Sequence, residues 1–172
     1  GIYHFNADAN QQAGFTVFVR PHAYPWISHP EQMIYPLRYL TSTREYAALL
    51  EAEDPKEAVD NFWIGNAGNE LRAKKLIREY YRRVEKANYL FSSHQEGWKT
   101  DRGMIYIMYG PPSVVQRGFS SEIWTYGESR HIMSLTFIFT RLSNPFTDSD
   151  YMLERSPNYK TGWYQMVNSW RR

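Results

Sequence analysis

The chain has 172 residues, with 20 Lys and Arg against 18 Asp and Glu, a net charge of +2, and 17% of its residues are aromatic. This length fits one domain, or one domain with part of a neighbour, and is sufficient for an ordinary hydrophobic core. The composition excludes disordered, collagen-like and low-complexity proteins. The longest apolar run, residues 132–139, is broken by Ser134 and Thr136 and is too short to cross a bilayer.

The chain contains no Cys, which excludes a disulfide framework, thiolate zinc sites and a cysteine nucleophile. The absence of Cys suits an exported bacterial protein. The sequence begins with Gly1 and not with Met. We therefore expect a mature or partial chain, in which a signal sequence would not be visible.

The first 35 residues predict an N-terminal strand and a proline-rich connector. Residues 1–13 are polar with scattered aromatic residues and predict a loop or the end of a preceding element. Residues 14–20 alternate between apolar and mixed positions, which predicts a strand. Four prolines in residues 21–36 favour an extended connector. Residues 1–35 could therefore be the remnant of an upstream β domain.

Three helical patterns follow the connector. Ser42 and Glu45 have the spacing of a capping box and predict the start of the first helix. Asp54, followed by Pro, predicts the start of a second helix, which we expect to end at Gly65. The third pattern is the longest, because apolar residues recur at steps of three and four over residues 69–91.

After residue 101 the pattern changes from helical periodicity to alternation. It predicts three antiparallel strands, at residues 104–109, 122–126 and 131–141, with a hairpin turn at 127–130. A final amphipathic helix is expected after Ser156.

Helices followed by strands indicate an α+β fold. We predict about three to four helices packed on one face of a three-stranded antiparallel meander, with an N-terminal extra strand. The main domain is expected to cover residues 36–172.

The segment of residues 94–103, which joins the long helix to the predicted sheet, is polar and dense in functional side chains. One interpretation is a rigid corner, in which Thr100 and Asp101 accept hydrogen bonds from backbone N–H groups. In that corner Gly97 and Gly103 would allow a positive φ. Trp98 would fill a gap beneath it.

The second interpretation makes the same segment a site. Asp101 would act as an acid, a base or a ligand anchor, with His94 nearby. Arg83 lies at the edge of the apolar stripe of the long helix, and a buried guanidinium needs a carboxylate or aromatic partner. Asp101 is the predicted partner of Arg83, and the alternative is an Arg whose head group reaches solvent.

The run Gly97-Trp98-Lys99-Thr100-Asp101 resembles the signature of the GWxTD domain family, which consists of bacterial envelope proteins found notably in Bacteroidetes. The similarity extends over residues 36–140 and includes Tyr80-Tyr81-Arg82-Arg83-Val84, Tyr109-Gly110-Pro111-Pro112 and Trp124-Thr125-Tyr126. The resemblance implies an exported, often lipid-anchored protein whose domain commonly follows a β-rich one. It implies no particular reaction.

Several other functions lack their sequence patterns. The chain has no Gly-x-Ser-x-Gly elbow and no phosphate loop or dinucleotide fingerprint. No two of its five His residues stand at i and i+4, so we predict no metal site and no cofactor. The third helix carries seven cations against three acids, but residues 44–60 carry six acids against two cations. Pairing between these helices is favoured over nucleic-acid binding.

The favoured hypothesis is a non-catalytic envelope module for protein–protein interaction, or an adaptor, without catalytic or metal-binding residues. It would contact a protein partner or a neighbouring domain through aromatic surface near the corner and the proline-rich segment, because interfaces are enriched in Tyr, Trp and Arg. The candidate binding residues are Trp98, Thr100, Asp101, Arg102, Arg83, Trp124 and Tyr126.

Two alternatives remain open. One is a hydrolase or glycan-binding protein with His94, Trp98 and Asp101 lining a cleft. The other is a purely structural adaptor inside a longer chain. In each case we expect export to the periplasm, outer membrane or cell surface. Attachment to the membrane would be peripheral, and a lipid anchor outside these residues could provide it.

Overall fold

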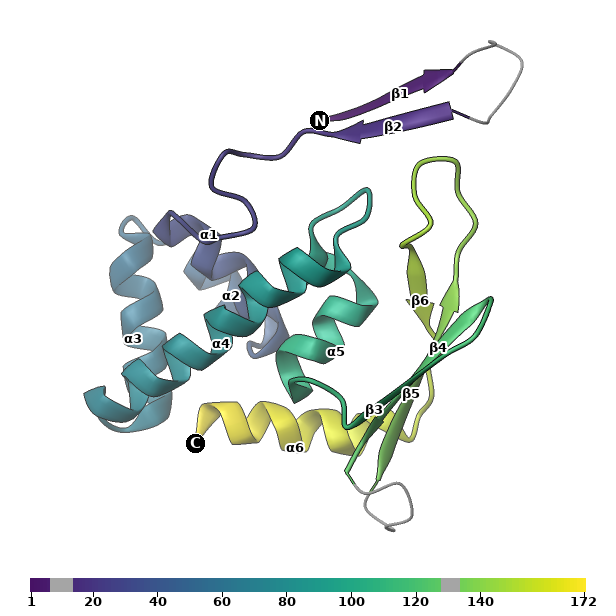
Figure 1. Ribbon diagram of the computed structural model, residues 1–172. Coiled ribbons are helices and arrows are strands. Elements are labelled where there is room, and N and C mark those ends of the chain that lie inside the picture. The colour runs from purple at the N-terminus through teal and green to yellow at the C-terminus, as the bar shows by residue number, and fades with distance from the viewer. Residues whose placement is uncertain (7–13, 128–133) are drawn as a thin grey trace.

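A sheet and a set of helices form the two layers of the protein (Figure 1). The computed structural model describes residues 1–6, 14–127 and 134–172, which contain six α-helices, two 3₁₀-helices and two antiparallel sheets. No helix in this described part of the chain combines the length and the apolar character needed to span a bilayer. The elements in chain order are β1 (Ile2–Asn6), β2 (Gly14–Phe18), α1 (Pro30–Ile34), η1 (Tyr35–Tyr39), α2 (Thr43–Leu50), α3 (Pro55–Ala67), α4 (Glu70–Phe91), η2 (Gly97–Lys99), α5 (Asp101–Tyr109), β3 (Val114–Arg117), β4 (Ser121–Tyr126), β5 (Leu135–Arg141), β6 (Tyr151–Leu153) and α6 (Tyr159–Arg171).

The larger sheet has four strands in the order β3-β4-β5-β6, all antiparallel, and it packs against helices through aromatic side chains. Trp124 of β4 stacks against Phe91 of α4, with ring centroids 5.2 Å apart. Phe137 of β5 lies 5.1 Å from Tyr109 of α5 and 4.8 Å from Tyr159 of α6. The aromatic residues therefore form the core between the sheet and three helices.

The helix α4 is the central element of the helical layer. Its N-cap is Asn69, whose side chain accepts a hydrogen bond from the backbone N–H of Arg72. The buried Tyr80 donates its hydroxyl to Pro36 O at 2.7 Å, and Tyr81 donates to Met33 O at 2.9 Å. These bonds fix the segment of α1 and η1 on the long helix.

Residues 104–109 form most of α5, so the predicted strand at this position is wrong. All six residues are apolar and therefore carry no period that separates a strand from a buried helix. Thr100 caps the start of the helix by accepting a hydrogen bond from Gly103 N at 3.0 Å. The helix ends at Gly110, whose φ of +83° lies in a region that glycine adopts readily.

The predicted number of strands in the sheet is also wrong, because the antiparallel sheet has four strands and not three. The strand at 122–126 is present as β4, and β5 begins at Leu135. The strands β3 and β6, at the two edges, were not predicted. The predicted turn at 127–130 and the start of the third strand fall largely on residues 128–133, outside the described residues.

The N-terminal region contains more structure than predicted. Residues 2–6, expected to be a loop or the end of a preceding element, form β1 and pair with the predicted strand β2 in a separate hairpin. The proline-rich segment is not extended throughout, because Pro30 lies in the first turn of α1, where its missing N–H costs no helical hydrogen bond. Together with α2 to α6, this gives more helices than the three to four predicted.

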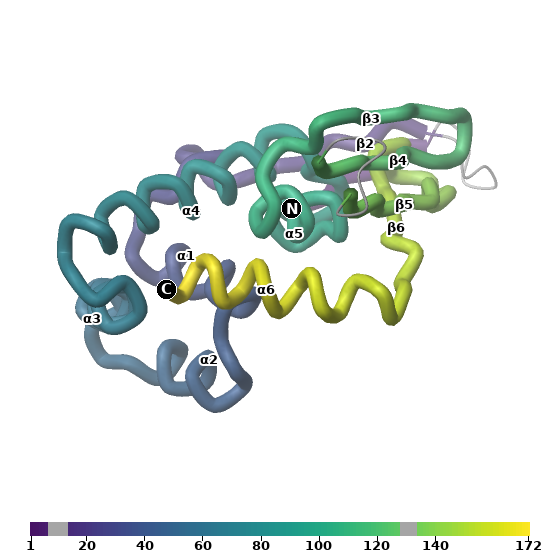
Figure 2. Tube along the Cα trace, turned by 90° about the horizontal axis from the view of Figure 1, so that it is seen from below, coloured from purple at the N-terminus to yellow at the C-terminus, as the bar shows by residue number. Residues whose placement is uncertain are grey.

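The C-terminal helix α6 runs from the sheet past α5 to α3 (Figure 2). Trp170 donates its indole N–H to Met108 O at 3.1 Å. Arg171 binds the Glu45 carboxylate at 2.5 Å and also donates to Leu40 O at 2.9 Å. The end of α6 therefore fastens α5 to the start of α2.

The ion pair between Glu45 and Arg171 predicts a pH-dependent contribution to stability. Hydrogen bonds from Arg171 lower the pKa of Glu45 from 4.5 to about 2. Because the folded-state pKa is depressed, the contribution is present above pH 4.5 and is lost as the pH falls toward 2. The Glu45 side chain is 41% exposed, so we expect at most about 1 kcal/mol.

Urea unfolding of the wild type and of Glu45→Gln checks this prediction. We expect Glu45→Gln to be less stable at neutral pH and the two stabilities to converge as the pH falls from 4.5 toward 2. A difference that stays constant over that interval would contradict the assignment of the stabilisation to the charged carboxylate.

Candidate functional site

The signature run begins with a backbone contact that only glycine permits. A Cβ built on Gly97 would lie 2.0 Å from Ala87 O of α4. A Cβ built on Gly103 would lie 1.8 Å from Gly97 O. No side chain fits between these segments, so α4, η2 and α5 touch directly through their backbones. The prediction that Gly97 and Gly103 adopt a positive φ is wrong, because the two glycines are needed for this close approach.

Thr100 closes this contact on the other side. Its hydroxyl donates to Gly97 O at 2.8 Å and accepts from Gly103 N at 3.0 Å. The residue is only 5% exposed. Both hydrogen-bonding roles of the hydroxyl are therefore used to start α5.

Trp98 is buried, and its backbone groups bind residues that are distant in the sequence. Its N–H donates to Oδ1 of Asn88 at 3.0 Å, and its carbonyl accepts from the Tyr39 hydroxyl at 2.7 Å. The Tyr39 ring lies edge-on to the indole, and burial raises the pKa of Tyr39. Lys99 Nζ lies 5.3 Å from the centre of the Trp98 ring.

Asn88 connects the corner to the proline-rich segment, a role that the sequence did not reveal. Its side-chain amide donates to Pro25 O at 3.1 Å. The backbone carbonyl of Asn88 accepts hydrogen bonds from Tyr24 Oη at 3.2 Å and from Ser92 Oγ at 2.5 Å. A buried Asn on an otherwise apolar helix face was the only available signal for this arrangement.

Asp101 joins the start of α5 to the edge of the sheet. Its Oδ2 accepts a hydrogen bond from Leu153 N of β6 at 2.7 Å, and its Oδ1 lies 3.5 Å from Arg155. The side chain is 21% exposed. The carboxylate is thus a bridge between helix and strand, which supports the interpretation as a rigid corner.

Arg102 forms a second bridge between α5 and the sheet. It is 9% exposed, lies 3.4 Å from Glu122 Oε2, and donates to Ser149 O at 2.7 Å. Its guanidinium lies 4.0 Å from the centre of the Tyr151 ring. Burial lowers the pKa of Arg102, and the Glu122 charge opposes that effect. Glu122 also accepts a hydrogen bond from the indole N–H of Trp124 at 3.1 Å. Trp124, another candidate binding residue, is therefore part of the same bridge.

Arg83 does not contact Asp101, and the predicted pair is wrong. Arg83 binds Glu79 Oε1 at 2.9 Å, one turn earlier on α4. It donates at 3.2 Å to the carbonyls of Ile107 and Met108, in the last turn of α5, where cations satisfy free carbonyl groups. Its guanidinium lies 5.0 Å from the centre of the Trp170 ring, so the predicted aromatic partner is present.

Tyr126, the last of the predicted binding residues, fastens the same end of α5. Its hydroxyl donates to Gly110 O at 2.9 Å, and burial raises its pKa. A Cβ on Gly110 would lie 3.1 Å from the Arg83 guanidinium carbon. Both ends of α5 are therefore fixed by side chains from α4 and the sheet.

His94 takes partners other than Asp101. Its Nδ1 lies 3.4 Å from Asp150 Oδ2 and 3.4 Å from Ser93 Oγ, and Ser93 also contacts Asp150. A catalytic triad requires Ser and Asp on opposite imidazole nitrogens, whereas both face Nδ1 here. Ser93 is 3% exposed, so a substrate cannot reach it. Among the described residues, no three His, Asp or Glu side chains gather as a metal site would require.

A pocket of about 410 Å³ lies beside this corner, between the proline-rich segment, η1 and α4. Five aromatic residues line it: Tyr24, Trp26, Tyr35, Tyr46 and Trp98. Arg38, Glu96 and Lys99 supply its charged groups. The pocket is therefore an aromatic concavity that is also lined by charged groups.

Fold and corner together define an α/β domain in which the signature residues join helices to a sheet. The sequence model of the GWxTD domain matches residues 1–172, the whole chain, and the protein therefore belongs to the GWxTD domain family. No curated protein and no solved structure matches the chain.

The contact at Gly97 predicts a large difference between two glycine substitutions. Gly97→Ala should be severely destabilising, by about 3 kcal/mol or more, because its Cβ would overlap a backbone carbonyl. Gly65→Ala is the matched control in the exposed side of α3, where a Cβ meets nothing within 4 Å. It should stabilise the helix by about 0.5–1 kcal/mol. Thermal unfolding of both variants checks this, and equal effects would contradict the close contact.

The hydrogen bond to Leu153 predicts how substitutions of Asp101 behave. Asp101→Ala should lower the free energy of unfolding by about 1–2 kcal/mol, because the backbone N–H of Leu153 in β6 loses its acceptor. Asp101→Asn should recover most of that loss, because an amide oxygen can accept the same bond. Chemical unfolding measures both values. Equal destabilisation by Ala and Asn would show that the negative charge, and not the acceptor, is required.

Proposed function

We propose that this domain is a non-catalytic interaction module of the bacterial envelope that binds an extended segment of a partner protein or neighbouring domain. The observation that carries the proposal is the aromatic pocket beside the signature corner. Its position agrees with the surface expected from the sequence, near both the corner and the proline-rich segment. The envelope setting rests on the family resemblance.

The exposed rings at the pocket supply the binding surface. Trp26 is 63% exposed and Tyr35 is 44% exposed, although both line a concave site. Exposed Trp and Tyr residues in such sites are the side chains that contribute most to protein interfaces. The neighbouring Trp98 is held by backbone hydrogen bonds, so the floor of the pocket is rigid before any partner binds.

The lining favours an extended, proline-containing segment. Aromatic-lined grooves bind polyproline II segments, because proline rings pack between flat aromatic faces and the extended peptide loses little entropy. Arg38 and Lys99 lie at the same pocket, and Lys99 is paired with Glu96 at 2.7 Å. Arg38 can therefore receive a carboxylate or a backbone carbonyl of the partner.

A hydrolase or glycan-binding site at His94, Trp98 and Asp101 has less support. His94 contacts Asp150, and Asp101 accepts from the backbone of β6. Trp98 is only 9% exposed, which leaves little ring surface for a sugar. The three side chains take separate partners, so no acid–base pair is formed from them.

Photo-crosslinking tests the proposed surface directly. A benzophenone amino acid at Tyr35 should crosslink a partner protein in an envelope extract of the source organism. The same amino acid at Tyr164, which is 58% exposed on α6, is the matched control and should not. Adding Trp26→Ala to the Tyr35 variant should reduce the crosslinked product at least tenfold. Equal crosslinking from both positions, or no effect of Trp26→Ala, would contradict the proposal.

A further inference from the structure

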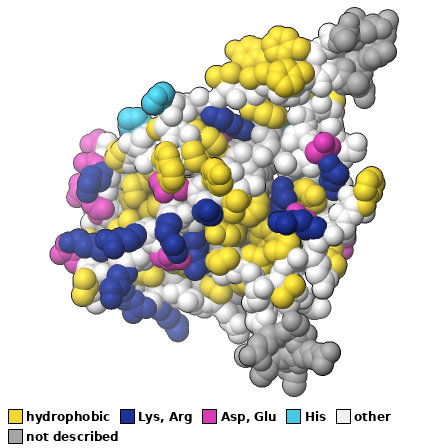
Figure 3. Space-filling view, in the orientation of Figure 1, with side chains coloured by type: hydrophobic (Ala, Val, Ile, Leu, Met, Phe, Trp, Pro, Cys, Tyr) yellow, Lys and Arg dark blue, Asp and Glu magenta, His cyan; other side chains and the backbone are white. Residues whose placement is uncertain are grey.

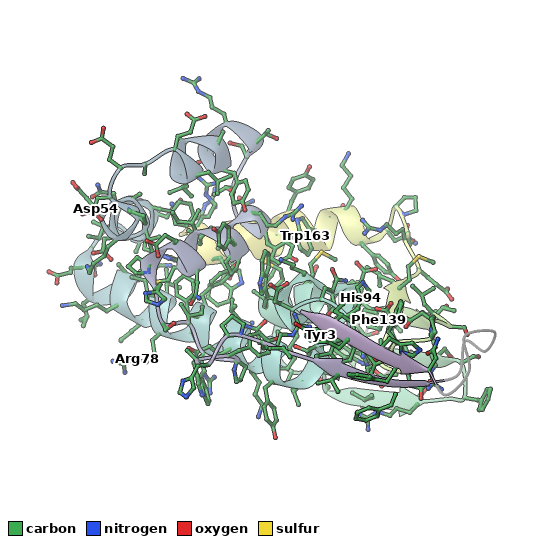
Figure 4. All side chains as sticks on the ribbon, turned by 90° about the horizontal axis from the view of Figure 1, so that it is seen from above. Tyr3, Asp54, Arg78, His94, Phe139 and Trp163 are labelled. Carbon is green, nitrogen blue, oxygen red and sulfur yellow. The ribbon has the colours of Figure 1, made fainter. Side chains whose placement is uncertain are left out.

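One side of α4 carries a straight line of cations. Lys75, Arg78, Arg82 and Lys86 are all exposed and stand at intervals of three and four residues, so they share one helix face. The basic residues gather over α4 in Figure 3, and Figure 4 shows Arg78 projecting away from the fold. We call these four residues the basic stripe.

The acids of α4 itself neutralise the stripe only in part. Glu70 pairs with Lys74 at 2.6 Å, outside the stripe. Glu79 binds Arg82 at 2.7 Å but is shared with Arg83 at 2.9 Å. Glu85 accepts a hydrogen bond from the backbone of the proline-rich segment. One acid is therefore divided between two cations, and the others are engaged elsewhere.

The acidic segment of residues 44–60 makes no ion pair with α4 among the described residues, so the predicted pairing between these helices is wrong. Glu45 binds Arg171, Asp60 binds Lys56, and Asp54 caps α3. Across the residues that the structure describes, no ion pair links Lys75, Arg78 or Lys86 to an acid. The stripe is thus a concentrated positive surface on a protein of nearly balanced charge.

Exposed apolar residues continue the stripe at both ends. Leu71 is 69% exposed and Tyr89 is 70% exposed, and both lie on the same helix face as the cations. Leu90, next to Tyr89, is 44% exposed. Lys86 Nζ lies 5.5 Å from the centre of the Tyr89 ring, so the aromatic and cationic groups are held together. The face thus combines a run of cations with exposed Leu and Tyr side chains at its ends, and these are residue types that contact an anionic bilayer surface.

We propose that the basic stripe of α4 binds the surface of an anionic lipid bilayer. Leu71 and Tyr89 stand eighteen positions apart, about 27 Å along a straight helix, so the stripe and its flanking apolar residues form one long, straight edge that a planar surface can contact. Contact with the phosphates of a nucleic acid would not bury the side chains of Leu71 and Leu90. At a bilayer the same side chains can enter the lipid headgroup region. The stripe is separate from the aromatic pocket, so membrane and partner could bind at once.

The expected affinity is modest and sensitive to salt. Each Lys or Arg at an anionic surface raises partitioning about fivefold, which corresponds to about 1 kcal/mol. Four such residues give an effect of several hundredfold before screening. The attraction should weaken at high ionic strength, because the screening length falls to about 3 Å at 1 M salt.

Vesicle flotation with two charge-reversal triples tests the proposal. The wild type should bind vesicles of phosphatidylcholine with about one third phosphatidylglycerol and not vesicles of phosphatidylcholine alone. Lys75→Glu/Arg78→Glu/Lys86→Glu should lower binding more than tenfold. Arg44→Glu/Lys160→Glu/Arg172→Glu changes the net charge equally at exposed positions off the stripe, and should lower it no more than about threefold. Melting curves of both triples confirm that they are folded.

Three results would overturn the proposal: equal losses in both triples, no preference for anionic vesicles, or stripe-dependent binding of duplex DNA or an acidic peptide without vesicle binding. Trp26→Ala should leave vesicle binding unchanged. A failure of the lipid proposal is therefore distinct from a failure of the partner-binding proposal.

Discussion

The direct contact between the backbones of Gly97 and Ala87 is the constraint on which the arrangement of the two layers depends. Because no side chain separates η2 from α4, the N–H of Trp98 reaches Asn88 and Thr100 is placed to start α5. The direction of α5 then decides where Asp101 and its neighbours meet the sheet. A small displacement at the glycine would move every contact along α5.

The signature residues thus use their polar groups inside the protein. Thr100 is engaged as donor and acceptor, Asp101 holds the edge strand, and the backbone of Trp98 is bonded on both sides. The two proposals therefore place binding on exposed aromatic and cationic groups outside the signature, on the proline-rich segment and on α4. Under the proposed function, the hydrogen bonds that hold Trp98 at the corner would keep part of the pocket lining rigid and so lower the entropic cost of association.

The parts of the fold that the sequence predicted well are those with local signals. Ser42 and Asp54 cap α2 and α3 as expected, since a cap and the N–H groups it satisfies lie within three residues of each other. Residues 104–109 were assigned to the wrong class because six consecutive apolar residues fit both periods. The strand β3 was missed because all four of its residues are exposed and it has no buried face to create alternation.

The site was harder to predict because its contacts join distant residues. Sequence reasoning paired Arg83 with Asp101 at the corner. In the structure the buried guanidinium at the corner is that of Arg102, whose carboxylate partner Glu122 lies in β4. Arg83 instead binds Glu79 of its own helix and carbonyl groups at the other end of α5. The sequence could not show which of Arg83 and Arg102 has its partner at the corner. Both residues stand next to apolar positions, and only the folded structure shows which groups face each of them.

The family signature likewise acquires its role only in the folded structure. In this chain it specifies a joint between layers, so another protein with the signature would be expected to share the joint, while its partner would be decided by surface residues such as Trp26 and Arg78 that lie outside it.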